Sequence, residues 1–148
     1  MNTKLFGLKK YLEILIELEA KNKFPKILML SGSKGQGKST LIAHFLSYYF
    51  DKDNYNLENF EIKKNNKLFP SFKDKFNANI FYFNCINNNT KIDEIRKLRT
   101  DLQKTSINND NQYVIFDDVE YLNENCVNAL LKTIEEPSIS NYFILINN

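Results

Sequence analysis

Eight consecutive residues, Gly32 to Ser39, have the types and spacing suited to binding phosphate. They read GSKGQGKS and fit the pattern G-x-x-x-x-G-K-[ST]. Closely spaced glycines let successive backbone N–H groups point into one concavity, and the N-terminus of a following helix adds partial positive charge. In such a loop Lys38 reaches the β- and γ-phosphates and Ser39 reaches Mg²⁺. The loop predicts a polyphosphate site; the alternative is a glycine turn between two core elements.

A pair of acids, Asp117-Asp118, directly follows the apolar run from Tyr113 to Phe116. Ligands of parallel sheets bind at the carboxyl ends of buried strands, and the pair resembles a Walker B element. We assign to Asp117 the role of helping to hold Mg²⁺ opposite Ser39. Asp118 stands where related ATPases carry the acid that activates water, often a glutamate. The Asp118 side chain is shorter than that of glutamate, and a displacement of about 1 Å can cost on the order of a hundredfold in rate. Whether this chain catalyses hydrolysis therefore stays open. The alternative is a strand-end turn with solvated aspartates.

Hydrophobic periodicity predicts the elements that position these residues. We expect strands at 27–30, 80–83, 113–116 and 142–146, and helices at about 8–21, after the phosphate loop, from a capping box at 90–93 to about 105, and from 123 to the proline at 137. Residues 51–79 are predicted to be an irregular, partly packed insertion. Strands that alternate with helices predict an α/β fold with a parallel sheet covered on both faces. The phosphate loop and Asp117 would then meet at one edge of the sheet.

Composition limits the classes of function. The 148 residues are 43% hydrophobic, which is enough for one domain over residues 1–148. The net charge is only +2, so contact with nucleic acid would have to come from a local patch or a partner subunit. Cys85 and Cys126 form no C-x-x-C pair, so no zinc is expected, and we give the single histidine, His44, no catalytic role. With no signal peptide or membrane span visible, we expect a cytoplasmic protein without membrane contact.

Three segments resemble bacterial clamp-loader ATPases of the DNA polymerase III family. Residues 114–148, VIFDDVEYLNENCVNALLKTIEEPSISNYFILINN, resemble the family's Walker B strand and the helix that ends in NALLKTIEEP. Further matches are FPKILMLSGSKGQGKSTL and IDEIRKLRTDLQ. Together they cover most of the chain apart from the insertion. The delta-prime subunit is the most similar member, with gamma/tau close behind.

The resemblance implies an AAA+ P-loop NTPase fold with a three-layer αβα core. It implies a subunit that binds ATP and Mg²⁺ within a ring of clamp-loader subunits and helps load the sliding clamp onto primed DNA. The family's strand order is 5-1-4-3-2, so we expect 1-4-3-2 here, with the strand at 27–30 as an open edge. Asn148 falls at or next to the sensor position that reads the γ-phosphate. The implied nucleotide contacts are Gly32, Ser33, Lys34, Gly35, Gln36, Gly37, Lys38, Ser39, Thr40 and Asn148.

The sequence also departs from the family pattern. Residues 51–79 contain no cysteine where bacterial members usually carry a four-cysteine zinc knuckle, and the family's trans-acting arginine, fifth strand, lid and collar are not present. We therefore expect either a fragment or a reduced homologue. Three functions stay open: a delta-prime-like or gamma/tau-like ATPase subunit, a stator-type subunit that does not hydrolyse ATP, and an unrelated phosphate-loop kinase or ATPase.

Overall fold

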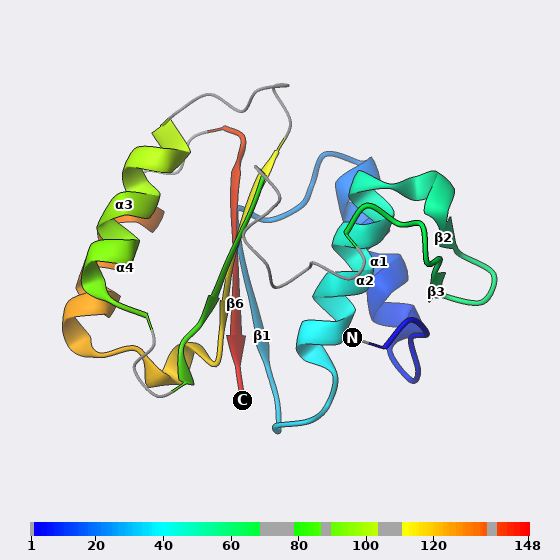
Figure 1. Ribbon diagram of the computed structural model, residues 1–148, viewed down its shortest axis with the longest axis horizontal. Helices are drawn as coiled ribbons and strands as arrows, with labels where there is room; N and C mark the ends of the chain where they lie inside the picture. The colour runs from blue at the N-terminus through cyan, green and yellow to red at the C-terminus, as the bar shows by residue number, and fades with distance from the viewer. Residues whose placement is uncertain (1, 69–78, 87–89, 104–110, 136–138) are drawn as a thin grey trace. The chain divides into compact units, whose positions relative to one another are not determined.

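The computed structural model describes the chain except residues 1, 69–78, 87–89, 104–110 and 136–138 (Figure 1). The chain forms two compact units. The first comprises Met1–Phe24 and Lys34–Asp74, and the second comprises Pro25–Ser33 and Lys75–Asn148. No helix in the described ranges is long and apolar enough to cross a membrane. That residues 1–148 act as one nucleotide-binding domain stays a prediction.

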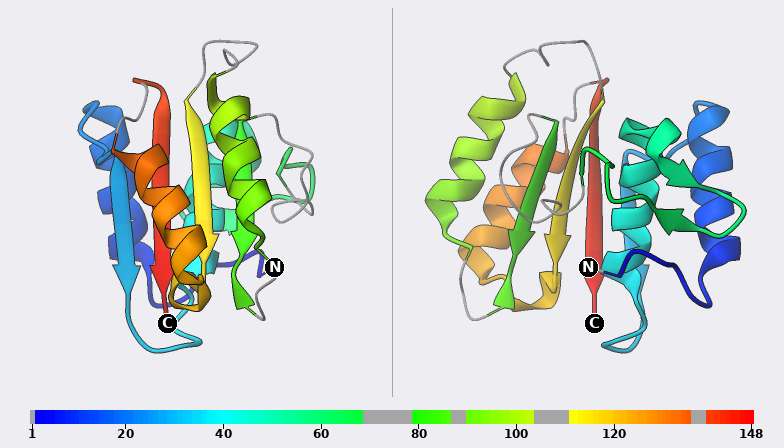
Figure 2. Two further views of the ribbon diagram at one scale, coloured as in Figure 1. Left: turned by 90° about the vertical axis from the view of Figure 1, so that its left-hand side faces the viewer. Right: turned by 45° about the vertical axis from the view of Figure 1, so that its right-hand side comes forward.

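The second unit contains a four-stranded parallel sheet in the order β1-β6-β5-β4 (Figure 2, left). Its strands are β1 (Ile27–Ser31), β4 (Ile80–Asn84), β5 (Gln112–Asp117) and β6 (Asn141–Asn147). This arrangement confirms the predicted order 1-4-3-2 and the α/β class. β1 is an edge strand, and its Ile27 and Met29 side chains are 44% and 57% exposed.

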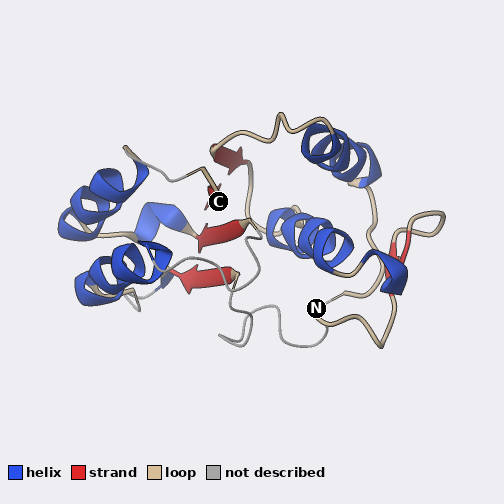
Figure 3. Cartoon of the chain, turned by 90° about the horizontal axis from the view of Figure 1, so that it is seen from above, coloured by secondary structure: helices blue, strands red, loops and turns tan. Residues whose placement is uncertain are grey.

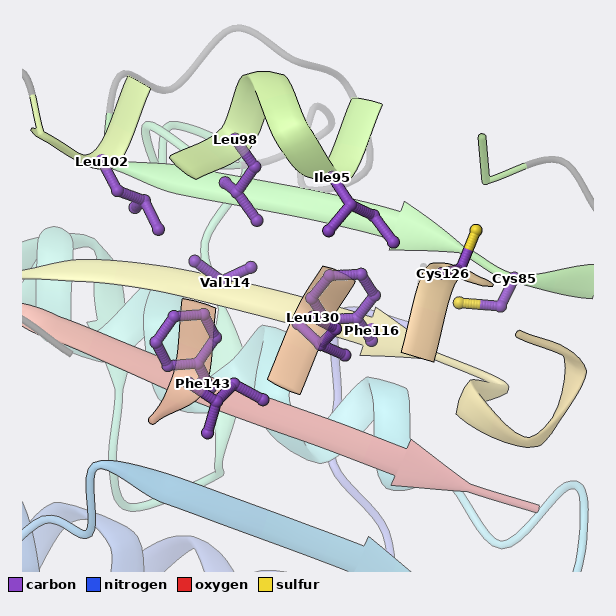
Figure 4. Close-up of a cluster of buried hydrophobic side chains, with 10 residues drawn as sticks. Cys85, Ile95, Leu98, Leu102, Val114, Phe116, Cys126, Leu130 and Phe143 are labelled. Carbon is purple, nitrogen blue, oxygen red and sulfur yellow. The ribbon is translucent and has the colours of Figure 1, made fainter. Parts of the chain in front are cut away.

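Helices α3 (Ile92–Gln103) and α4 (Glu124–Ile134) lie side by side over one face of this sheet (Figures 2 and 3). Side chains from both helices and from the sheet form one apolar core, in which full burial of a large side chain contributes about 1.5–3 kcal/mol. The buried members are Cys85, Ile95, Leu98, Leu102, Val114, Phe116, Cys126, Leu130, Ile134 and Phe143 (Figure 4). β5 is buried at every position, and it pairs with a strand on either side.

The two helices begin differently. Asn123 caps α4 as predicted, because its Oδ1 accepts a hydrogen bond from the N–H of Cys126 at 2.9 Å. The predicted capping box at 90–93 is wrong: the Thr90 hydroxyl donates to the carbonyl of Asn84 at 3.3 Å. The Glu94 carboxylate instead accepts from the N–H of Lys91 at 3.0 Å, so the box residues are shifted by one position. The predicted end of α3, near 105, lies outside the described residues. α4 ends at Ile134, before the proline at 137 that was predicted to stop it.

The first unit contains α1 (Lys9–Ala20) and α2 (Lys38–Phe50), which pack against each other, followed by η1 (Lys52–Asn54). β2 (Tyr55–Asn56) and β3 (Glu61–Ile62) pair antiparallel, and the N–H of Ile62 donates to the carbonyl of Thr3 at 2.7 Å. Residues 51–68 are therefore more regular than the predicted irregular insertion. They bury Phe60, Ile62 and Leu68, whereas Phe69, Phe72 and Phe76 lie outside the described residues.

His44 of α2 is fully buried and holds two other segments of the first unit. Its Nε2 lies 3.1 Å from the carbonyl oxygen of Asn2, and its Nδ1 lies 2.8 Å from the hydroxyl of Tyr55. Because a carbonyl can only accept, Nε2 carries the hydrogen and Nδ1 accepts from the tyrosine. Burial lowers the pKa of His44, and the bond to Asn2 raises it in part.

This lowered pKa predicts a pH-dependent stability. In the unfolded chain His44 has a pKa of about 6.5. Below that pH the unfolded chain binds more protons than the folded chain, so the stability that His44 contributes is fully present only above it. It falls as the pH drops toward the folded pKa. Thermal melts from pH 7.5 to 5 should show a steeper loss of melting temperature for the wild type than for His44→Gln. Equal slopes would contradict the assignment.

Candidate nucleotide site

The predicted phosphate loop connects β1 to α2 and carries no regular structure from Gly32 to Gly37. Gly35 and Gly37 have φ of 85° and 82°, in the left-handed region that other residues adopt only with strain. A Cβ added to Gly35 would meet no atom within 4 Å, so the space beside it is open. Helix α2 begins at Lys38, directly after Gly37. A helix N-terminus directs N–H groups and partial positive charge at an anion, so these residues fit a polyphosphate.

Asp117 is the last residue of β5 and only 5% exposed. The hydroxyl of Tyr82, on β4, donates to its Oδ2 at 2.5 Å. Burial raises the pKa of Tyr82, and the bond to Asp117 and the charge of Asp117 raise it further, so the phenol stays a neutral donor. Asp117 could be identified from the sequence. Tyr82 could not, because the hydrophobic pattern indicates only that it lies in a strand.

Asp118 leaves the strand in the left-handed conformation, with φ 58° and ψ 49°, and leads into η3 (Val119–Tyr121). The side-chain amide of Asn148 donates to its Oδ1 at 2.6 Å. The backbone N–H of Asn148 lies 3.3 Å from both carboxylate oxygens of Glu120. The acid and the sensor-like residue identified separately in the sequence therefore contact each other. Glu120 was missed, because nothing in its local sequence indicates a contact 28 residues away.

The parallel register brings three strand ends to one edge of the second unit. Asp117 pairs with Ile146, and Ser31, which directly precedes Gly32, pairs with Asn147. The phosphate loop thus starts at the edge that carries the acids. Lys38, Ser39 and Thr40 belong to the first unit.

The donor set of the predicted metal site fits Mg²⁺. This ion prefers oxygen and usually takes one or two carboxylates together with phosphates and water, rather than a cage made only of protein groups. The hydroxyl of Ser39 and the carboxylate of Asp117 are donors of this kind. In the described part of the chain, no group of three or more His, Cys, Asp or Glu side chains is arranged to hold a metal ion.

A groove of about 390 Å³ lies between α3 and α4. Its charged side chains, Arg96, Arg99 and Lys132, are all cationic. Arg96 is 3.5 Å from Asp93, but both groups are well exposed, so this ion pair is weak. The remaining lining residues are Ile92, Asn125, Asn128, Ala129 and Thr133. Because the net charge of the whole chain is small, the composition alone does not reveal this local concentration of positive charge.

The structure is similar to the DNA polymerase III, gamma subunit-related protein from Thermotoga maritima, with a TM-score of 0.56 and 20% sequence identity. The similar region covers 95% of this chain and 38% of that chain. The likeness shows that the two chains share an α/β fold. Residues 7–148 match the family described as DNA polymerase III, delta subunit, and the chain belongs to that family. A search of curated proteins found no match.

The conformations of the loop glycines predict that substitution by alanine lowers the stability of the protein. Alanine at Gly35 or Gly37 should lower the free energy of unfolding by about 1–2 kcal/mol, because both have positive φ. Gly37→Ala should cost more, because its new Cβ would lie 3.1 Å from Cδ1 of Leu8. In urea unfolding, the double variant Leu8→Ala/Gly37→Ala should lose less than the sum of its single variants. Additive losses would argue against this contact.

Proposed function

We propose that this chain is an ATP-binding, delta-prime-like subunit of the DNA polymerase III clamp loader that helps load the sliding clamp onto primed DNA during replication. The observation that carries the proposal is the phosphate-loop motif, which starts at the sheet edge where Asp117 ends β5 and continues into the N-terminus of α2. Membership of the DNA polymerase III delta subunit family supports association with other clamp-loader subunits.

The proposed roles follow from the donor types. Backbone N–H groups of the loop bind the phosphates, Lys38 contacts the β- and γ-phosphates, and Ser39 and Asp117 hold Mg²⁺. Bound Mg²⁺ neutralises charge on the β- and γ-phosphates. Asn148 reads the γ-phosphate next to Asp118, and their hydrogen bond supports joint action of the two residues.

A stator-type subunit that binds ATP without hydrolysing it is the second candidate, ahead of a gamma/tau-like ATPase. The observation that favours it is the state of Asp118, the proposed general base. This side chain is 5% exposed and already accepts a hydrogen bond from Asn148 at 2.6 Å. A general base must reach the water it activates, so hydrolysis requires Asn148 to release Asp118 or to share it.

The groove between α3 and α4 supports a contact with primed DNA within the assembled ring. Lys and Arg side chains that neutralise backbone phosphates bind DNA without reading its sequence, and Arg96, Arg99 and Lys132 supply three such charges. A loader that acts at many primed sites needs binding of this sequence-independent kind.

Substitution of the loop lysine tests nucleotide binding. Lys38→Ala should weaken ATP affinity by roughly 10- to 100-fold, because a hydrogen bond to a charged group contributes about 1.5–3 kcal/mol. Lys23→Ala is the control, since this lysine is also exposed and lies outside the phosphate-loop motif. Equal ATP affinity of wild type and Lys38→Ala in calorimetry would refute the proposal.

Phosphate release by the assembled ring separates a subunit that hydrolyses ATP from a stator-type subunit that only binds it. A rate that falls with Lys38→Ala assigns hydrolysis to this subunit. An unchanged rate, when the same variant no longer binds ATP, assigns it the stator role.

The DNA contact predicts a change in salt dependence. The slope of log affinity against log salt changes by roughly 0.9 for each DNA phosphate that the protein ceases to neutralise. The assembled ring carrying Arg96→Ala, Arg99→Ala and Lys132→Ala together should therefore bind primed DNA with a slope shallower by roughly 2 to 3. Lys97→Ala, an exposed α3 position that does not line the groove, is the control and should leave the slope nearly unchanged. An unaltered slope in the triple variant would exclude the groove.

A further inference from the structure

Tyr82 lies beside the acid edge but belongs to neither motif of the proposed site. Its Cα pairs with Ile115, two residues before Asp117 in the parallel register. Strands rise about 3.3 Å per residue, so roughly 6.6 Å along the strand separates these two levels. The long phenol side chain spans this distance, and its hydroxyl donates to Oδ2 of Asp117 at 2.5 Å.

The neighbours of Tyr82 explain why a tyrosine makes this contact. Asn84 pairs directly with Asp117 in the register, but its side-chain oxygen accepts from the N–H of Ile86 at 3.1 Å. On the opposite face of the same two strands, Phe83 stacks on Phe116 with ring centroids 4.8 Å apart. This stacking adds to the backbone pairing that joins β4, which carries Tyr82, to β5, which carries Asp117.

We propose that Tyr82 is a positioning residue that orients the Asp117 carboxylate as a ligand for Mg²⁺. The inference rests on the nucleotide-binding function proposed above. Hydrogen bonds from outer groups fix the orientation of metal-binding carboxylates, and loss of such a partner typically weakens metal affinity by about 10- to 100-fold. Tyr82 therefore affects the metal-dependent part of nucleotide binding and leaves the metal-independent part alone.

Tyr82→Phe removes one oxygen and keeps the ring. With the full chain and a fluorescent ADP, the Mg²⁺ concentration for half-maximal enhancement of binding should rise about 10-fold or more. Affinity for the same ADP in EDTA should stay unchanged, whereas a merely structural role would lower both. Tyr142→Phe is the matched control, because Tyr142 is also a half-buried tyrosine of this sheet and stacks on Tyr113. It should bind as the wild type does.

The outcomes separate this inference from the proposed function. No binding of the fluorescent ADP by the wild type removes the proposed function. Mg²⁺-dependent binding by the wild type, with the same Mg²⁺ midpoint in Tyr82→Phe, overturns only the role of Tyr82. Combined with Asp117→Asn, Tyr82→Phe should add no further loss, and an additive loss also overturns the inference. Thermal melts establish folding first, and Tyr82→Ile, which also lacks the hydroxyl and suits a strand, replaces Tyr82→Phe if that variant does not fold.

Discussion

The pairing of β5 with β4 on one side and β6 on the other is the interaction on which the acid edge depends. The register places Val114 and Phe116 in the core under α3 and α4, and directs Ile115 and Asp117 to the opposite face. A shift of one residue would exchange the two faces and move the Asp117 carboxylate into that apolar core. Burial of a charge without partners is costly, so the hydrophobic pattern of β5 also specifies where the acid lies.

Much of the sheet could be predicted from the sequence, because its strands are short, strongly apolar runs separated by helical periodicity. The left-handed residues of the loop also follow from their glycines. The β2-β3 hairpin could not be predicted, because strands of two residues have no measurable period. The capping box at 90–93 was misplaced because Thr90 and Lys91 both stand three residues before an acid, and only the helix start distinguishes them.

The contacts that shape the candidate site depend on register and on long sequence separation. Tyr82 and Asp117 are 35 residues apart, and Asp118 and Asn148 are 30 residues apart. The cationic groove likewise forms because α3 and α4 lie side by side. Asp117 and Asp118 are both almost fully buried, and each accepts a hydrogen bond.

The function proposed above requires that the phosphate loop, Gly32 to Ser39, and Asp117 bind one nucleotide and its metal ion. A crystal structure with Mg²⁺ and a non-hydrolysable ATP analogue tests it most directly. The account predicts phosphate oxygens at the N–H groups of the loop, and Mg²⁺ about 2.0–2.1 Å from the hydroxyl oxygen of Ser39. Asp117 should bind the same ion directly or through one water. A nucleotide bound elsewhere, or Asp117 turned away from the metal, would contradict the account.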